Sequence, residues 1–148
     1  MKAQGSTPRA YGLILSLLTA LFFLRVAGQA LVAFFHVAFL PEMQEWYSGL
    51  IPYSVLFPIQ CAMLAFMAKV PWDLVNGRGF FAAARAKVGG FFIAFSCIYF
   101  TAMVFRYGWT MLLYPERRWF GGTIPIFFHF VLAAYLFVWG HFNRCDAS

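Results

Sequence analysis

The stretch VGGFFIAFSCIYFTAMVFRYGWTMLLY, residues 88 to 114, decides the fold because it is too long and too apolar for the interior of a small soluble domain. Arg106 is its only charged residue. About 20 consecutive apolar residues are enough for an α-helix to cross the hydrocarbon core of a bilayer. This stretch is therefore predicted to be a transmembrane helix.

Three other segments have the same character, and together they predict an all-α membrane protein, a four-helix transmembrane bundle in a single domain (1–148). The expected spans are 11–40, 50–70, 88–114 and 120–140. Hydrophobic residues make up 63% of the chain and charged residues only 11%. Because roughly a quarter of the residues of a soluble domain are charged, this composition excludes a water-soluble globular protein.

Proline and polar residues separate the predicted spans, in the segments 41–45, 71–73 and 114–116. Proline inside a helix removes a backbone donor and usually marks its end. We therefore expect the second span to end before Pro71. The longest connection, residues 71 to 87, is expected to contain a short interfacial helix at 80–85.

The basic residues predict the orientation, because cytoplasmic loops of membrane proteins carry an excess of Lys and Arg. A cytoplasmic N-terminus places seven of them inside and only two, Arg117 and Arg118, outside. The seven are Lys2, Arg9, Lys69, Arg78, Arg85, Lys87 and Arg144. We expect both termini to be cytoplasmic and the protein to lie in the bacterial inner (cell) membrane. The basic residues form no dense stripe, which argues against nucleic acid as a partner.

Polar side chains within the predicted spans are the candidates for a ligand-binding site, because polar groups are costly in lipid and usually face a bundle interior, a cavity or a partner. They are Arg25, Gln29, Tyr53, Gln60, Tyr99, Arg106 and His129. With about 100° and about 1.5 Å per helical residue, those of one helix share a face and the four helices meet in one layer. The chain's five carboxylates, Glu42, Glu45, Asp73, Glu116 and Asp146, are all expected in loops or the tail. A lipid, a cofactor or a partner is thus expected to neutralise Arg25.

Several ligands suit this layer. Quinone carbonyls and lipid phosphates accept hydrogen bonds from Arg, His, Gln and Tyr, and an aromatic lining accommodates their chains. His36 and His129 are candidates for the axial ligands of haem b. Glu42, Glu45 and His36 are candidates for a divalent metal site. Alternatively, the polar residues serve only to fix helix register through hydrogen bonds.

Catalytic signatures are missing from the sequence. It contains no H-E-x-x-H, no G-x-S-x-G and no phosphate-binding glycine loop, and its three cysteines form no C-x-x-C pair. The sequence favours a small non-catalytic accessory subunit or binding module that holds a lipid or a quinone and packs against other integral membrane subunits or copies of itself. The alternative is a small haem b electron carrier or a quinone-linked oxidoreductase.

Overall fold

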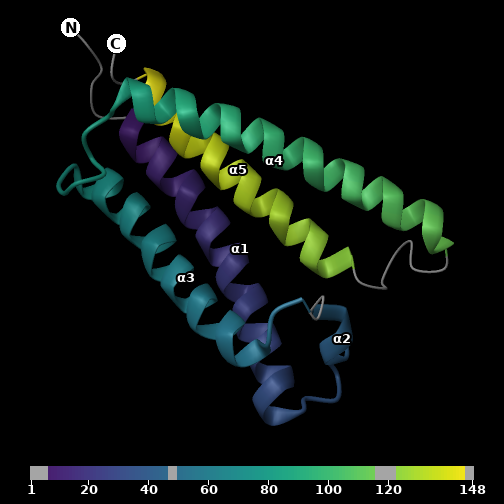
Figure 1. Cartoon of the computed structure of the whole chain (residues 1–148). Helices are drawn as coiled ribbons and strands as arrows, with labels where there is room; N and C mark the ends of the chain where they lie inside the picture. The colour runs from purple at the N-terminus through teal and green to yellow at the C-terminus, as the bar shows by residue number, and fades with distance from the viewer. Residues whose placement is uncertain (1–6, 47–49, 116–122, 146–148) are drawn as a thin grey trace, which may run out of the picture.

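The computed structural model describes residues 7–46, 50–115 and 123–145 (Figure 1). This part of the chain forms α1 (Thr7–Phe35), a short α2 (Met43–Trp46), α3 (Tyr53–Asn76), α4 (Ala86–Leu113) and α5 (Thr123–Cys145). All four long helices are long and apolar enough to cross a bilayer. The prediction of an all-α, four-helix bundle in an integral multi-pass membrane protein is confirmed.

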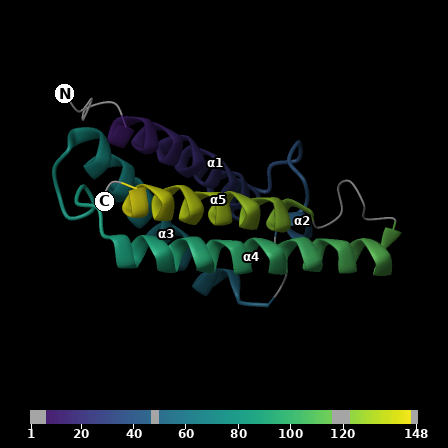
Figure 2. The same ribbon diagram turned by 90° about the horizontal axis from the view of Figure 1, so that it is seen from above.

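The helices pack as two pairs, α1 with α3 and α4 with α5, and the pairs meet where α1 packs against α5. Figure 1 shows the two pairs diverging toward the end of the bundle where α2 lies, and α2 packs against both α1 and α5 there. The views in Figures 1 and 2 also place the start of α1 and the end of α5 at the same end of the bundle. The cytoplasmic location of that end remains a prediction.

The hydrophobic core lies in the half of the bundle nearer this end, where α1, α3 and α5 meet. Its fully buried members include Leu15 of α1, Leu74 of α3, and Tyr135 and Phe142 of α5. Aromatic edge-to-face contacts extend the core, because the ring centroid of Trp139 lies 5.5 Å from that of Phe66. At the other end of the bundle, the described residues form no comparable cluster, and a cavity lies between the helix pairs.

Pro71 lies inside α3, so the expectation that the second span ends before it is wrong. A proline has no N–H, which leaves the carbonyl of the residue four positions earlier, Met67, without its helical donor. Two hydroxyls reach that oxygen: Tyr135 donates to it at 2.9 Å, and Thr19, at 3.0 Å, shares its one hydroxyl proton between it and the Leu15 oxygen at 2.7 Å. The helix can therefore continue through the proline because its neighbours satisfy the carbonyl.

α3 ends instead at Asn76, and Gly77 follows in the left-handed conformation with φ 63°. The Gly77 N–H donates to the Leu74 oxygen at 3.3 Å and the Arg78 N–H to the Asp73 oxygen at 3.2 Å. This pair of bonds is the Schellman motif that closes many helices.

The first span is also shorter than expected. α1 ends at Phe35, and the next residue, His36, has the left-handed φ of 49°.

Asp73 is buried in the last turns of α3, which corrects the expectation that every carboxylate lies in a loop or the tail. Its carboxylate forms an ion pair with Lys69 and accepts a hydrogen bond from the Phe81 backbone N–H at 3.3 Å. The connection between α3 and α4 is thus fixed to α3. No helix forms at 80–85, contrary to prediction, and Phe81 packs against Phe66 with ring centroids 5.4 Å apart.

α4 and α5 approach closely through two glycines, Gly89 and Gly140. A Cβ atom at Gly89 would lie 2.6 Å from the Arg144 backbone nitrogen and 2.7 Å from the Gly140 oxygen. Small residues at helix contacts in membranes allow this kind of close packing. Gly90, the next residue, has nothing within 4 Å of its Cβ position.

Candidate functional site

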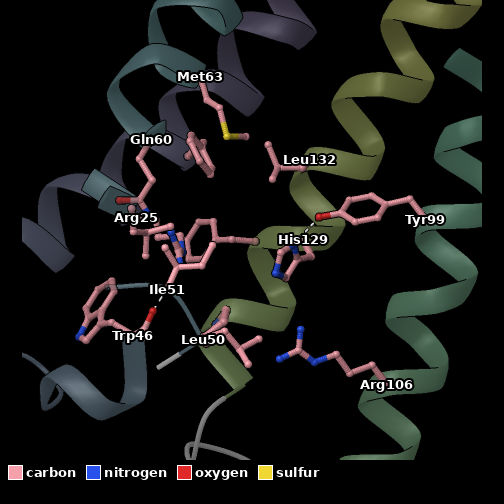
Figure 3. A pocket seen from close by; sticks show the side chains of 14 residues that line it. Arg25, Trp46, Leu50, Ile51, Gln60, Met63, Tyr99, Arg106, His129 and Leu132 are labelled. Atoms are coloured by element: carbon pink, nitrogen blue, oxygen red, sulfur yellow. Dashed lines mark hydrogen bonds between the residues drawn. The ribbon is translucent and has the colours of Figure 1, made fainter. Parts of the chain in front are cut away.

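A cavity of about 380 Å³ lies where the two helix pairs diverge (Figure 3). Its lining combines polar side chains from all four long helices with apolar side chains, and α2 contributes Trp46. The polar lining residues are Arg25, Gln60, Tyr99, Arg106 and His129. The structure thus brings together five of the seven residues predicted from the sequence.

Arg25 extends from α1 and holds α2 in place. Its Nη2 donates to the Trp46 carbonyl oxygen at 3.2 Å, and the Trp46 indole N–H donates in turn to the Pro41 oxygen at 3.0 Å. The guanidinium carbon lies 5.6 Å from the ring centroid of Phe128, within the range of a cation–π contact. The buried Nε of Arg25 has no hydrogen-bond partner among the described residues.

The positive charge of Arg25 has no acidic partner in this cavity. None of the described lining residues carries a carboxylate, and the one ion pair recorded within the ranges 7–46, 50–115 and 123–145 joins Lys69 to Asp73. Glu116, ten positions after Arg106 in the sequence, lies outside the described residues. A carbonyl and an aromatic ring stabilise a guanidinium only partly, so the cavity favours an anionic guest.

The opposite wall of the cavity comes from α4 and α5. Tyr99 and Arg106 are seven residues apart and both line the cavity, as the helical spacing predicts. The Tyr99 hydroxyl is hydrogen-bonded to Nδ1 of His129. When the hydroxyl donates, the ring proton resides on Nε2, which points away from Tyr99 in Figure 3 and is left to donate to a ligand. Arg106 extends from α4 toward the same space.

Gln60 connects the cavity wall to α1. Its Nε2 donates to Oε1 of Gln29 at 3.1 Å, and both side chains are buried. Gln29 is fully enclosed, does not line the cavity and lies behind Gln60, so a role in ligand binding stays a prediction. The Nε2 of Gln29 and the Oε1 of Gln60 have no further partner in the described part of the chain.

Replacing Gln29 with leucine is expected to lower the free energy of unfolding by about 0.5–2 kcal/mol, because the buried Gln60 amide loses its acceptor. Replacing Gln29 and Gln60 together with leucine is expected to cost less than the two single changes added, since no buried amide then remains unpaired. Unfolding by sodium dodecyl sulfate in mixed micelles, followed by circular dichroism, measures both. Strictly additive losses would show that the two amides do not interact.

Two residues predicted from the sequence lie away from the cavity lining. Tyr53 lies at the start of α3, and its ring centroid is 6.0 Å from that of Phe34 and 5.8 Å from that of Phe57. His36 is exposed in the segment after α1 and does not share the cavity with His129. The described geometry therefore does not assemble these histidines as a haem site. No group of three His, Cys, Asp or Glu side chains arranged for a metal occurs in the described ranges.

Sequence reasoning missed the contribution of the segment that follows α1. Trp46, Leu50 and Ile51 line the cavity. No polar signal marks Leu50 and Ile51, since their role depends on how α2 packs between α1 and α5. Periodicity within a single helix does not reveal such a placement.

Neither protein-family models nor comparisons with curated proteins and solved structures reveal a match to this chain. The cavity is the candidate functional site of this chain. Its decisive features are two arginines on facing walls, a hydrogen-bonded Tyr–His pair and a large apolar surface between them.

Proposed function

We propose that the protein is a small integral membrane binding module whose cavity holds an amphiphile, either a lipid or a quinone. One observation carries the proposal: a cavity between helices long and apolar enough to cross a bilayer, in which hydrogen-bond donors face a mainly apolar lining. Ligand pockets typically combine such an apolar wall with a few polar groups that fix the ligand's orientation. The volume of about 380 Å³ falls in the range of such pockets.

The chemistry of the lining supports an amphiphile. Arg25, Arg106 and the His129 imidazole supply donors that fit a carbonyl or a phosphate. Phe22, Met63 and Leu132 supply apolar surface that fits an acyl or isoprenoid chain. Both halves of such a molecule would find matching groups in one place.

The proposal includes a role as an accessory subunit in a larger membrane assembly. Among the described helices, α4 packs mainly against α5, and Gly89 and Ser96 are its buried residues within the described part of the chain. Its outward residues include Phe91, Ile98, Phe105 and Leu112, all more than 60% exposed. This face is available to lipid, to another membrane protein or to a second copy.

Native mass spectrometry of protein extracted with its surrounding membrane into polymer nanodiscs tests the proposal. We expect the chain to retain a lipid or quinone that survives partial delipidation. Leu132→Trp should fill the cavity and abolish retention, whereas Leu112→Trp, on the exposed face of α4, should not. A wild-type chain that keeps no amphiphile would overturn the binding function, and a chain that always appears alone would overturn the subunit role.

A further inference from the structure

We propose that the amphiphile is an anionic lipid, with its phosphate bound between Arg25 and Arg106. The inference rests on the proposed binding function and adds the chemistry of the head group. It is carried by the arrangement in Figure 3, in which the two arginines enter one cavity from α1 and α4. The two helices belong to different helix pairs, so a ligand between them would bridge both halves of the bundle.

The charge balance of the cavity selects an anion. Two guanidinium groups line it, and the described lining residues include no carboxylate. Arginine remains protonated even when it is buried, so both charges persist in a region of low dielectric constant. A neutral quinone would accept hydrogen bonds but add no negative charge to a lining whose described residues include no carboxylate. An anionic phosphate compensates them directly.

Unused hydrogen-bond donors point to the same chemistry. Arg25 and Arg106 both line the cavity, and Arg25 uses Nη2 for the Trp46 carbonyl, while its Nε is enclosed by protein and is not among the donors that face the cavity. A guanidinium presents a planar set of donors that matches the oxygens of a phosphate. The His129 imidazole adds one more donor on the α5 side when Tyr99 donates to its Nδ1.

The apolar lining favours a lipid phosphate over free phosphate. Apolar side chains line much of the cavity: Leu50, Ile51, Leu56, Pro125 and Phe128. An inorganic ion has no apolar surface to bury against them, whereas a lipid chain has. Leu50 is 79% exposed, so the apolar lining continues to the outside of the chain. An acyl chain can therefore follow this surface from the phosphate into the surrounding membrane.

The test compares four probes on delipidated protein in neutral detergent: dioleoylphosphatidylglycerol, dioleoylphosphatidylcholine, ubiquinone-2 and inorganic phosphate. Affinities come from native mass spectrometry and thermal shift. We expect phosphatidylglycerol to bind at least about 10-fold more tightly than either alternative, because phosphatidylcholine carries a choline cation beside its phosphate that two arginines repel, and ubiquinone-2 carries no charge. Inorganic phosphate alone should give no comparable stabilisation.

Arg106→Met should weaken phosphatidylglycerol binding by about 10-fold or more, and Arg106→Lys should restore part of it, because lysine keeps the charge but not the planar donors. Arg25→Met should act similarly. Arg78→Met is the matched control, since Arg78 is exposed beyond the end of α3 and its loss changes the net charge equally. It should leave the affinity unchanged.

The outcomes separate the two proposals. Equal binding of phosphatidylglycerol and phosphatidylcholine, preference for ubiquinone-2, or no effect of the Arg106 variants would overturn the anionic head group while the binding function stands. Equal stabilisation by inorganic phosphate would overturn the lipid as its source. No binding of any lipid or quinone would overturn both proposals.

Discussion

Gly89→Ala is expected to lower the free energy of unfolding by about 1–3 kcal/mol, the range found when extra methyl groups are forced into a packed contact. The added Cβ would lie 2.6 Å from the Arg144 backbone nitrogen and 2.9 Å from the Asn143 carbonyl carbon. Backbone atoms cannot rotate away as a side chain does. α4 and α5 must therefore separate, or one of them must shift along its axis.

The neighbouring Gly90→Ala provides the control, because the same atom added one residue later meets nothing within 4 Å. Alanine is the better helix former, so Gly90→Ala should leave stability unchanged or raise it by up to about 1 kcal/mol. Unfolding by sodium dodecyl sulfate in mixed micelles, with circular dichroism at 222 nm as the signal, compares the two variants. Equal stability of both would contradict the close packing of α4 on α5.

Gly79→Ala is expected to cost about 2–3 kcal/mol of unfolding free energy, since two effects act together. Gly79 has φ 109°, a conformation that side chains rarely adopt. Its Cβ would also lie 2.5 Å from the carboxyl carbon of Asp73, the buried acid that holds the connection between α3 and α4. The substitution should therefore release the Phe81 backbone from α3.

Two further variants separate the causes. Gly77→Ala should lower the free energy of unfolding by about 1 kcal/mol, through its left-handed backbone alone. No steric contribution is expected, because nothing lies within 4 Å of its Cβ position. In an Asp73→Ala background the steric part of the Gly79→Ala penalty should disappear and the backbone part should remain. Thermal unfolding in detergent measures all four proteins. A Gly79→Ala penalty that does not change in the Asp73→Ala background would show that the carboxylate does not crowd Gly79.

The candidate site was partly predictable from sequence, and the reason is local geometry. Tyr99 and Arg106 are seven residues apart on one helix, so they share a face whatever the helix packs against. The same rule placed Arg25 and Gln29 on one face, but it could not tell which of them would line a cavity. Gln29 turned out to be enclosed against Gln60, whereas Arg25 reaches the cavity and α2.

Pro71 illustrates where local rules fail. The missing N–H of a proline is a local fact, and it argues correctly that the Met67 carbonyl loses its helical donor. Whether the helix ends depends on replacement donors, which come from Thr19 and Tyr135, 48 and 68 positions away in the sequence. α3 ends before Gly77 and not before Pro71, because the left-handed conformation of Gly77 completes the Schellman motif.

The sequence by itself determined that the chain crosses a membrane with four helices. Hydropathy sums over a segment of about 20 residues and does not depend on its neighbours. Only the tertiary structure decided that the helices form two diverging pairs, that α2 packs between α1 and α5, and that Asp73 is buried. Those features depend on contacts between distant residues, and the cavity between Arg25 and Arg106 exists because of them.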